Sequence, residues 1–557
     1  MTLFDLIIVG AGSAGCVLAN RLSADGRRVL LIEAGGDDAS PLIRMPKGMA
    51  KLVADPRHAW HFPVAQRREP GLPAAEVWVR GKGLGGSSSI NGMIYTRGQP
   101  QDYDAWGEVA GSDWNWAAMK AAFMAIENHE LGPDEQRGAG GPLHISTNRF
   151  RYRLSEAAVR AGEELGLPRR EDLNREDQEG VGYYAHTIHR GRRFSAADAF
   201  LEPALKRPNL RVVTGTHVER VLFDGRRAVG VAARNAQGAV DYRCSGEVIL
   251  CAGTLLSPKI LQLSGVGPGA LLQSLGIAVV RDSPDVGARL RDHLGLLSSH
   301  RLVGDKGIGH CFYGIGLAKS VLQYVLLKSG PMATGPFEVG AFARTEPQLA
   351  LPDTQLYISA FTYPRSDDNF PVPGGIERKP GVTIYAQMLK LSSEGRIRVS
   401  SADPQAPLDI EPNWLSNAAD RHTAVATLKL MRRYMAQPAL APYLGEELVP
   451  GAQCADDEDL LRYARRAALC GLHAVGSCRM GRDDRAVVDE RLRVRGVDGL
   501  RVVDCSVMPG LVSANTNGPA MALGWRAADL ILEDLRAAAG GADPARLAGV
   551  GCAACLP

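Results

Sequence analysis

The sequence has no stretch of about 18 uncharged apolar residues, which is what a membrane-spanning helix would need. It also lacks the start of a secretory signal, because an apolar strand pattern begins at Leu3 with no basic segment before it. We therefore expect a cytoplasmic protein without a transmembrane segment. Peripheral association with a membrane stays open.

Long blocks of charge of one sign are absent as well. The 64 basic and 61 acidic side chains leave a formal net charge of +3 and are spread along the chain. This pattern gives no reason to expect a nucleic acid as partner. A small molecule is the expected partner, and the sequence leaves the oligomeric state open.

The chain has no disulfide framework, because its ten cysteines are scattered. Cys552 and Cys555 have redox spacing, but no strand or helix pattern surrounds them, so we expect residues 541–557 to form a passive, flexible tail. Internal repeats are absent too. With 557 residues the chain is too long for one simple core, and two domains with interleaved segments are expected.

The first 33 residues have the pattern of a dinucleotide-binding unit. An apolar strand at 3–9 runs into Gly10, Gly12 and Gly15, and a helix and a second strand at 29–32 follow. Gly10 suits a tight turn, Gly12 lets the backbone approach a pyrophosphate, and Gly15 lets the helix pack on the strand. Glu33, about 20 residues further on, suits ribose hydroxyls. The unit predicts an ADP-containing cofactor and does not by itself separate NAD from FAD.

A second glycine-rich stretch covers residues 80–93. Its glycines and hydroxyls offer many donors and little bulk, so it resembles chain laid against a ligand more than a surface loop. Strands are expected at 211–214, 218–223, 228–231, 247–253, 355–358, 382–385 and 501–504, and helices at 154–165, 254–263, 420–435 and 519–535. The strand at 501–504 would return to the first sheet, and residues 517–519 would cap the last helix.

Four separated stretches resemble the glucose-methanol-choline (GMC) oxidoreductase family of flavoproteins. They are residues 10–33, 81–98, 253–267, and the pair 472–476 with 515–517. The resemblance implies FAD in an extended pose. It also implies an α/β fold with a Rossmann-like FAD-binding domain and a second, α+β substrate domain with an antiparallel sheet.

The expected domain boundaries follow from these stretches. Residues 1–290 would form the main part of the FAD-binding domain, with lid-like and substrate-side insertions at about 101–190. Residues 291–470 would form the substrate domain. Residues 471–540 would return to the FAD-binding domain with the catalytic loop.

The resemblance also implies roles for individual residues. His473 would be the catalytic base with Asn515 beside it, Glu33 would hold the ribose, and Asp504 would meet the ribityl chain. Val218 would contact the adenine through its backbone. The other expected cofactor contacts are Gly10, Gly12, Ser13, Ala14, Gly15, Ala34, Gly83, Gly86, Ser87, Asn91, Gly92, Met93, Ile94, Ala252, Cys505 and Thr516.

Three positions distinguish this chain within the family. Ala474 stands where many members have proline, and Asn515 stands where many sugar oxidases have a second histidine, so the chain looks closer to the choline-type and simple-alcohol branch. Some relatives attach flavin through a histidine just before the asparagine of the second glycine stretch. Here that position is Ile90, so we expect FAD without a covalent link.

The expected reaction is oxidation of an alcohol to an aldehyde or ketone. A hydride would leave for flavin N5 while a histidine base removes the hydroxyl proton, and electrons would pass to oxygen or a quinone-like acceptor. The helix at 519–535 would direct its positive end at the flavin. An alternative is a lyase of the same fold that binds flavin and acts on cyanohydrins, and an NAD-dependent dehydrogenase is a third reading.

Other reactive residues have weaker patterns. His293 is a rival base, although a structural contact at the domain boundary suits it better. Cys470, His473 and Cys478 lack the spacing of a zinc ribbon and a fourth ligand, so no metal is expected. Glu338 could serve a cationic substrate, but one acid does not identify choline.

Overall fold

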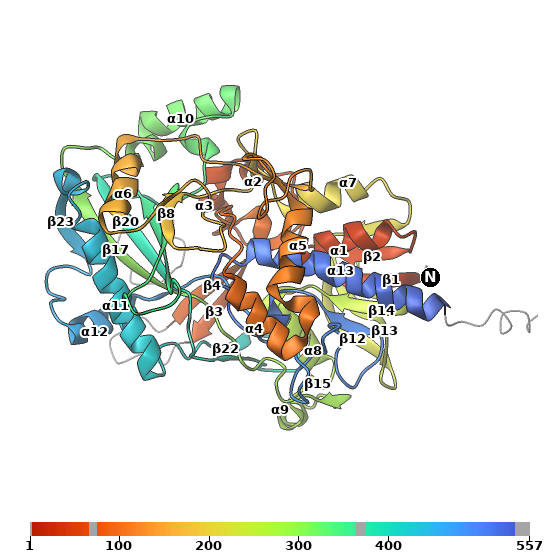
Figure 1. Cartoon of the computed structure of the whole chain (residues 1–557). Helices are drawn as coiled ribbons and strands as arrows, with labels where there is room; N and C mark the ends of the chain where they lie inside the picture. Colours follow the sequence, from red (N-terminus) through yellow and green to blue (C-terminus); the bar gives the residue numbers. More distant parts are fainter. Residues whose placement is uncertain (1–2, 66–74, 364–374, 541–557) are drawn as a thin grey trace, which may run out of the picture.

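The computed structural model describes residues 3–65, 75–363 and 375–540. The expected tail at 541–557, with Cys552 and Cys555, lies outside these residues. Two large β-sheets organise the molecule (Figure 1), one near each end of the long axis of this view. Within the described residues no helix is both long and apolar enough to cross a membrane.

The first sheet is a parallel sheet built from segments far apart in the sequence. Its order is β11 (Leu210–Val213), β2 (Val29–Ile32), β1 (Phe4–Val9), β14 (Gly238–Leu250) and β25 (Leu500–Val502). The expected return of the chain near residue 501 is therefore confirmed. The first half of β14 also pairs antiparallel with β13 (Arg227–Asn235), which pairs with β12 (His217–Asp224).

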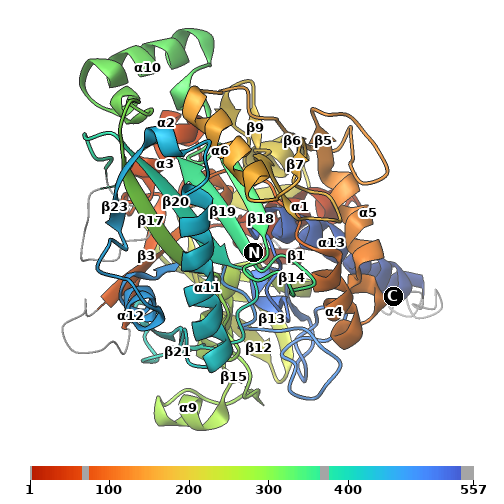
Figure 2. The same cartoon turned by 60° about the vertical axis from the view of Figure 1, so that its left-hand side comes forward.

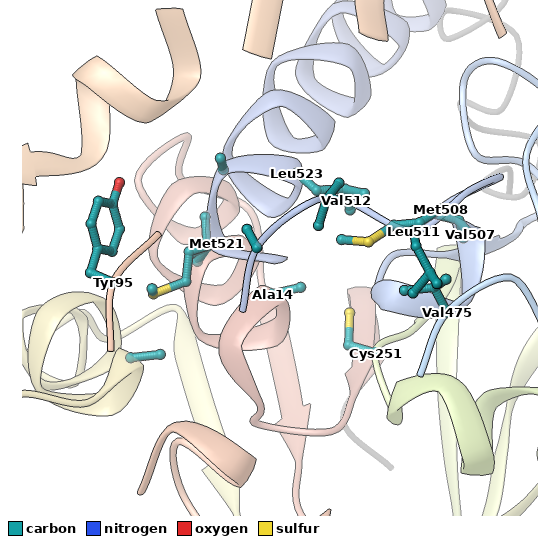
Figure 3. Packing of buried hydrophobic residues seen from close by; sticks show 14 of the residues in the cluster. Ala14, Tyr95, Cys251, Val475, Val507, Met508, Leu511, Val512, Met521 and Leu523 are labelled. Atoms are coloured by element: carbon teal, nitrogen blue, oxygen red, sulfur yellow. The ribbon is translucent and has the colours of Figure 1, made fainter. Parts of the chain in front are cut away.

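Two helices from opposite ends of the chain pack together over this sheet (Figure 1). They are α1 (Ser13–Ser23) and α13 (Asn517–Gly540), and α5 (Trp116–Ile126) packs on α13. The helix α13 begins at Asn517, two residues earlier than expected. Figure 3 shows buried side chains where α1 meets the C-terminal segment, with Ala14 close to Met521. This packing holds the start of α13 close to the end of β1.

The second sheet is antiparallel except for its last pair of strands. Its order is β23 (Leu444–Val449), β17 (Leu294–Leu302), β20 (Gly381–Met388), β19 (Thr354–Ser359), β18 (Val339–Ala343), β8 (Gly180–Tyr183) and β7 (Arg169–Arg170). The helix α11 (Ala418–Met435) packs on β17 and β20, and Figure 2 shows it crossing this sheet. Another helix, α6 (Arg153–Glu164), packs on β8, β18 and β19. The segment 101–190 thus supplies two strands of this sheet, while the domain boundaries given above stay a prediction.

Residues 36–79 have no clean periodicity in the sequence, yet part of this segment forms a hairpin with the residues just beyond it. The strands β3 (Ala59–Ala65) and β4 (Ala75–Gly81) pair antiparallel, with Ala59 opposite Gly81. Trp78 is fully buried and stacks on Trp414, with ring centroids 5.8 Å apart. The hairpin is therefore stabilised by a contact more than three hundred residues away, which local patterns do not reveal.

Arg501 connects the returning strand to both neighbours, and we expect its loss to destabilise the fold. Its side chain is 1% exposed and donates to both carboxylate oxygens of Glu247 at 2.7 and 3.0 Å, and to Asp534 at 2.9 Å. Arg501→Met should lower the free energy of unfolding by about 2–3 kcal/mol, because it leaves the partly buried carboxylate of Glu247 without this partner and removes one of the two arginines that pair with Asp534. Urea unfolding measures this loss.

Arg493→Met is the matched control. Its ion pair with Asp489 is as short, at 2.8 Å, but the arginine side chain is 51% exposed. Such surface pairs contribute less than about 1 kcal/mol. Equal losses for the two variants would contradict the structural role given to Arg501.

Candidate active site

A cavity of about 410 Å³ runs from the edge of the first sheet to the face of the second. Five of its lining positions come within three residues of the ends of parallel strands. Gly10 follows β1, Glu33 follows β2, Thr216 follows β11 closely, Ala252 follows β14, and Asp504 follows β25. Carboxyl ends of parallel strands meet at one edge of a sheet, where ligands of such folds bind. The fold therefore brings these five positions together.

The geometry of the first glycine turn matches the roles expected for its glycines. Gly10 has φ of +100°, and a Cβ there would lie 2.5 Å from the Cys251 carbonyl oxygen. A Cβ on Gly15 would collide with the Gly10 carbonyl oxygen. In contrast, a Cβ on Gly12 would meet nothing within 4 Å, although Gly12 lines the cavity. Gly10 and Gly15 thus satisfy packing, whereas Gly12 presents bare backbone to the cavity.

Glu33 lines the cavity and also joins three backbone segments. Its carboxylate accepts hydrogen bonds from the N–H groups of Ala11 at 2.9 Å, Gly35 at 2.8 Å and Gly83 at 3.0 Å. Oε1 takes two of these bonds and Oε2 takes one, so one lone pair on Oε2 is left for a ligand hydroxyl. Burial raises the pKa of Glu33, and the three backbone donors oppose that rise.

Most residues expected to touch the cofactor line this cavity. Those that do are Gly10, Gly12, Ser13, Ala14, Glu33, Ala34, Gly86, Ser87, Asn91, Gly92, Met93, Ile94, Val218, Ala252, Asp504, Cys505, Asn515 and Thr516. Gly15 and Gly83 do not. Gly15 lies behind the turn against Gly10, and Gly83 is turned toward the Glu33 carboxylate. These two glycines support the wall instead of forming it.

Asp504 holds the end of β25 against the end of β14. Its Oδ2 accepts hydrogen bonds from the Gly253 N–H at 2.9 Å and the Ser257 hydroxyl at 2.6 Å, and its Oδ1 accepts one from the Ser506 N–H at 2.8 Å. The start of α13 also borders the cavity, where Asn517 accepts a hydrogen bond from the Ser13 hydroxyl at 2.7 Å. The positive end of α13 therefore faces the cavity.

His473 is placed by strand pairing with the second sheet. The short strand β24 (Leu469–Cys470) pairs antiparallel with the start of β17, and the Gly471 N–H donates to the His293 carbonyl at 2.8 Å. The His473 N–H donates to Asp292 Oδ1, also at 2.8 Å. The loop that carries His473 is thereby held against residues 291–293.

The structure brings His473 and Asn515 together, as the sequence predicts. His473 Nε2 lies 3.2 Å from Asn515 Nδ2, and His473 Nδ1 lies 3.0 Å from His293 Nδ1. Both His473 and Asn515 line the cavity, whereas His293 is fully buried behind them. His293 is thus a neighbour of the expected base and does not reach the cavity wall.

The orientation of the Asn515 amide is fixed by its other contacts. Its Oδ1 accepts hydrogen bonds from Thr96 Oγ1 and Gln355 Nε2, both at 3.2 Å. Its Nδ2 donates to the Tyr357 hydroxyl at 3.1 Å, which in turn donates to Gln387. Nδ2 is therefore the atom that faces His473, so His473 Nε2 must be an acceptor.

This direction determines the tautomers of both histidines. A neutral imidazole that accepts at Nε2 carries its proton on Nδ1, so His473 donates to His293 Nδ1. His293 then carries its own proton on Nε2, on the side of the Val512 backbone. The unprotonated His473 Nε2 at the cavity wall accepts from Asn515 Nδ2, and a substrate hydroxyl would have to take the place of that contact to reach its lone pair.

The electrostatic surroundings keep His473 neutral. Burial, then His293 and Arg80, lower the pKa of His473 well below its usual 6.5. Burial also lowers the pKa of His293 to about 3. The nearby Asp292 has a pKa raised to about 6 by burial, against the pull of Arg80 at 3.8 Å.

The wall opposite the glycine turns is aromatic and was not foreseen from the sequence. Thr383, Tyr385 and Gln387 alternate along β20, so all three face the cavity, and Tyr357 on β19 lies opposite Tyr385. The Phe337 ring lies 5.3 Å from that of Tyr357. The alternation within 382–385 predicts a strand, but the face that meets the cavity depends on the register of the sheet.

Glu338 is not an accessible, unpaired carboxylate that could bind a cationic substrate. It is fully buried, and its carboxylate lies 3.4 Å from Lys47 Nζ and accepts hydrogen bonds from Thr334 at 3.1 Å and Tyr152 at 3.3 Å. Burial raises its pKa, while Lys47 opposes the rise. We assign Glu338 to a buried ion pair beneath the aromatic wall.

Known proteins resemble this chain over nearly its full length. An alcohol dehydrogenase [acceptor] from Pseudomonas putida is 40% identical over 536 residues, which cover 95% of this chain and 96% of that protein. An oxygen-dependent choline dehydrogenase from Ectopseudomonas mendocina is 38% identical over 549 residues, covering 95% and 94% of the two chains.

Solved structures share the fold. Pyridoxine 4-oxidase from Mesorbium loti superposes with a TM-score of 0.85 at 31% identity, covering 95% of this chain and 99% of its own. A formate oxidase variant from Aspergillus oryzae gives a TM-score of 0.88 at 25% identity, with 96% and 99% covered. Sequence models of GMC oxidoreductases match residues 4–295 and 392–524. The chain therefore belongs to the GMC oxidoreductase family, whose enzymes oxidise CH–OH donors.

Proposed function

We propose that this chain oxidises an alcohol to an aldehyde or ketone, with His473 as the base at a bound FAD. The observation that carries the proposal is the His473–Asn515 pair at the cavity wall, with an unprotonated Nε2 that faces the cavity. FAD is the expected cofactor of a GMC oxidoreductase, and it would supply the hydride acceptor when bound.

The wall residues fit FAD from end to end. The bare backbone at Gly12 suits a pyrophosphate, and the free lone pair of Glu33 suits a ribose hydroxyl. Val218 would border the adenine, and Asn91 to Ile94 would lie along the flavin. Ile90 has no nucleophilic atom, so we propose that FAD is held without a covalent bond. Acid precipitation should leave the yellow colour in the supernatant.

The chemical task of the chain's own residues is to move one proton. His473 Nε2 would accept the substrate's hydroxyl proton, and Asn515 Nδ2, 3.2 Å away, would donate a hydrogen bond to the same oxygen. A developing positive charge on His473 would be shared with His293 through the Nδ1 contact, while Asp292 holds the His473 backbone N–H and so positions the loop that carries the base. The positive end of α13 borders the same cavity and would stabilise negative charge on a bound flavin.

The residues around the cavity also bear on the class of alcohol substrate and of electron acceptor. Phe337, Tyr357 and Tyr385 form an apolar wall next to His473 and Asn515. Glu338 is already ion-paired with Lys47. We propose an uncharged alcohol with an apolar or aromatic body as the preferred substrate, with oxygen or a quinone-like compound as acceptor. Anaerobic mixing with primary, aromatic, polyol and cationic alcohols tests this order. Bleaching of the flavin by an uncharged alcohol supports the proposal, whereas a cyanohydrin lyase would leave the flavin oxidised with every alcohol.

Glu33→Ala should weaken both FAD binding and the walls that hold it. The change removes the acceptor of three backbone N–H groups as well as the proposed ribose contact, and each charge-assisted hydrogen bond contributes about 1.5–3 kcal/mol. We expect the affinity for FAD to fall by about 10-fold to 100-fold and the apoprotein to melt at a lower temperature. Flavin release on dilution and thermal unfolding measure the two effects.

Glu33→Gln keeps the shape of the side chain and removes its negative charge, so it tests the two contributions separately. Its amide nitrogen would face a backbone N–H that also needs an acceptor, so we expect a loss of affinity close to that of the alanine variant. The role of Glu33 would be refuted by an alanine variant that purifies fully loaded and keeps its FAD on dilution.

His473→Ala should slow the reduction of the flavin without removing it. Loss of a positioned base costs about 10² or more in rate, and Asn515→Ala should cost less because it removes a hydrogen bond and no base. Both variants should stay yellow and folded. Anaerobic stopped-flow reduction by a good alcohol measures the rates. A His473→Ala variant within a few-fold of the parent would end the assignment.

The pH profile of the same reaction follows from the lowered pKa of His473. Because the neutral form of the base persists below the usual pKa of 6.5, the reduction rate should stay on its plateau as pH falls to that value and should decline only at lower pH. A free imidazole would already be half protonated there. A decline that begins well above pH 6.5 would contradict the desolvated environment inferred for His473.

A further inference from the structure

The helix α10 (Gly314–Leu327) presents its apolar side to solvent, unlike the other amphipathic helices of this fold. Six of the twelve large apolar side chains exposed in the described part of the chain belong to it: Ile315, Leu317, Leu322, Val325, Leu326 and Leu327. Ile315, Leu322 and Leu326 are spaced by seven and four residues and so share one face. Leu326 is 70% exposed and Ile315 is 78% exposed.

The body of the protein holds the opposite face of α10. Ser320 and Tyr324 are its buried residues, and the Tyr324 hydroxyl donates to the Arg44 carbonyl at 3.1 Å. Figures 1 and 2 both show α10 at the outer margin of the molecule, above the second sheet. The outward apolar side is therefore fixed by anchoring contacts and is not a fraying end.

Basic groups surround this apolar face and acidic groups are scarce. Residues 306–337 contain no aspartate or glutamate. At one end, Arg378 lies 5.9 Å over the Tyr313 ring beside exposed Lys379. At the other end, Gly191 lies too close to the Lys328 carbonyl for any side chain, so exposed Arg190 and Arg192 flank the end of the helix.

We infer that α10 docks this protein in the interface of a membrane that contains anionic lipids. Its 14 residues span about 21 Å, which is short of the roughly 30 Å hydrocarbon core, so the helix would lie along the surface. An outward apolar face bordered by basic residues combines the two forces that hold such helices, namely apolar burial and attraction to anionic lipid. Lys319 lies on the same face and would extend its ammonium toward the headgroups.

A second copy of the chain fits this face less well. A two-fold dimer places the same patch on both partners, so the basic residues at the ends of α10 would meet basic residues, with no acid on either helix to oppose them. The acid near the N-terminal end, Glu377, is already paired with Arg301 at 2.6 and 2.8 Å. An anionic surface supplies the missing charge.

The test is sedimentation of the purified holoenzyme with vesicles. We expect binding to vesicles of two thirds phosphatidylcholine and one third phosphatidylglycerol, and weaker binding to phosphatidylcholine alone. Leu322→Gln/Leu326→Gln should reduce binding by about 10-fold or more, because it removes two residues of the apolar face. Lys319→Gln should reduce the preference for anionic vesicles while leaving the helix intact.

The matched control changes two exposed apolar residues elsewhere. Leu205→Gln/Val279→Gln alters side chains that are 50% and 38% exposed, and it should bind vesicles like the parent. Every variant should keep the parent's rate of anaerobic flavin reduction, since none of these residues lines the cavity. This rate tests the proposed function separately, because vesicle binding requires no turnover.

Two outcomes would overturn the inference. One is a holoenzyme that sediments with neither kind of vesicle. The other is a dimer in sedimentation velocity that the Leu322→Gln/Leu326→Gln variant converts to monomer, which would make a second copy the occupant of this face.

Discussion

Backbone N–H groups from three segments of this chain donate hydrogen bonds to one buried carboxylate, that of Glu33. The wall of the cofactor cavity depends on these three bonds. The Glu33 oxygens accept from the first glycine turn, from the loop after β2 and from the second glycine-rich stretch. A buried carboxylate is costly unless its lone pairs are satisfied, so the three N–H groups and Glu33 stabilise one another. The consequence is a backbone surface whose parts cannot shift independently, which is what close binding of a pyrophosphate requires.

The end of the cavity that holds His473 and Asn515 likewise depends on its hydrogen bonds, here on their direction. Thr96 and Gln355 fix the Asn515 amide, the amide fixes the tautomer of His473, and His473 fixes that of His293. Burial lowers the pKa of both imidazoles and so keeps the lone pair of His473 available. The same burial would penalise the protonated base, and the positive charge of Arg80 adds to that penalty.

Local sequence patterns predicted the parts of the fold that are determined by residues close together in the chain. The unit from β1 to Glu33 is visible because its glycines, strand periods and acid lie within about 30 residues. The pairing of His473 with Asn515 was expected from the family resemblance and from their places before and after the returning strand β25 in the chain. The contact of Glu33 with Gly83 and that of His293 with His473 were not, since they join residues 50 and 180 positions apart through sheet register.

Periodicity identifies the apolar face of a helix but not what covers it. In α10 the spacing of Ile315, Leu322 and Leu326 is that of a core-facing helix, yet Ser320 and Tyr324 form its inner side. From α10 the chain runs through a short turn at Pro331–Ala333 to Pro336 and Phe337, which line the cavity. A bilayer against α10 would therefore lie beside the segment that walls the substrate side. An acceptor dissolved in lipid would gain from that proximity, whereas oxygen, which diffuses freely, would give no reason to expose six apolar side chains.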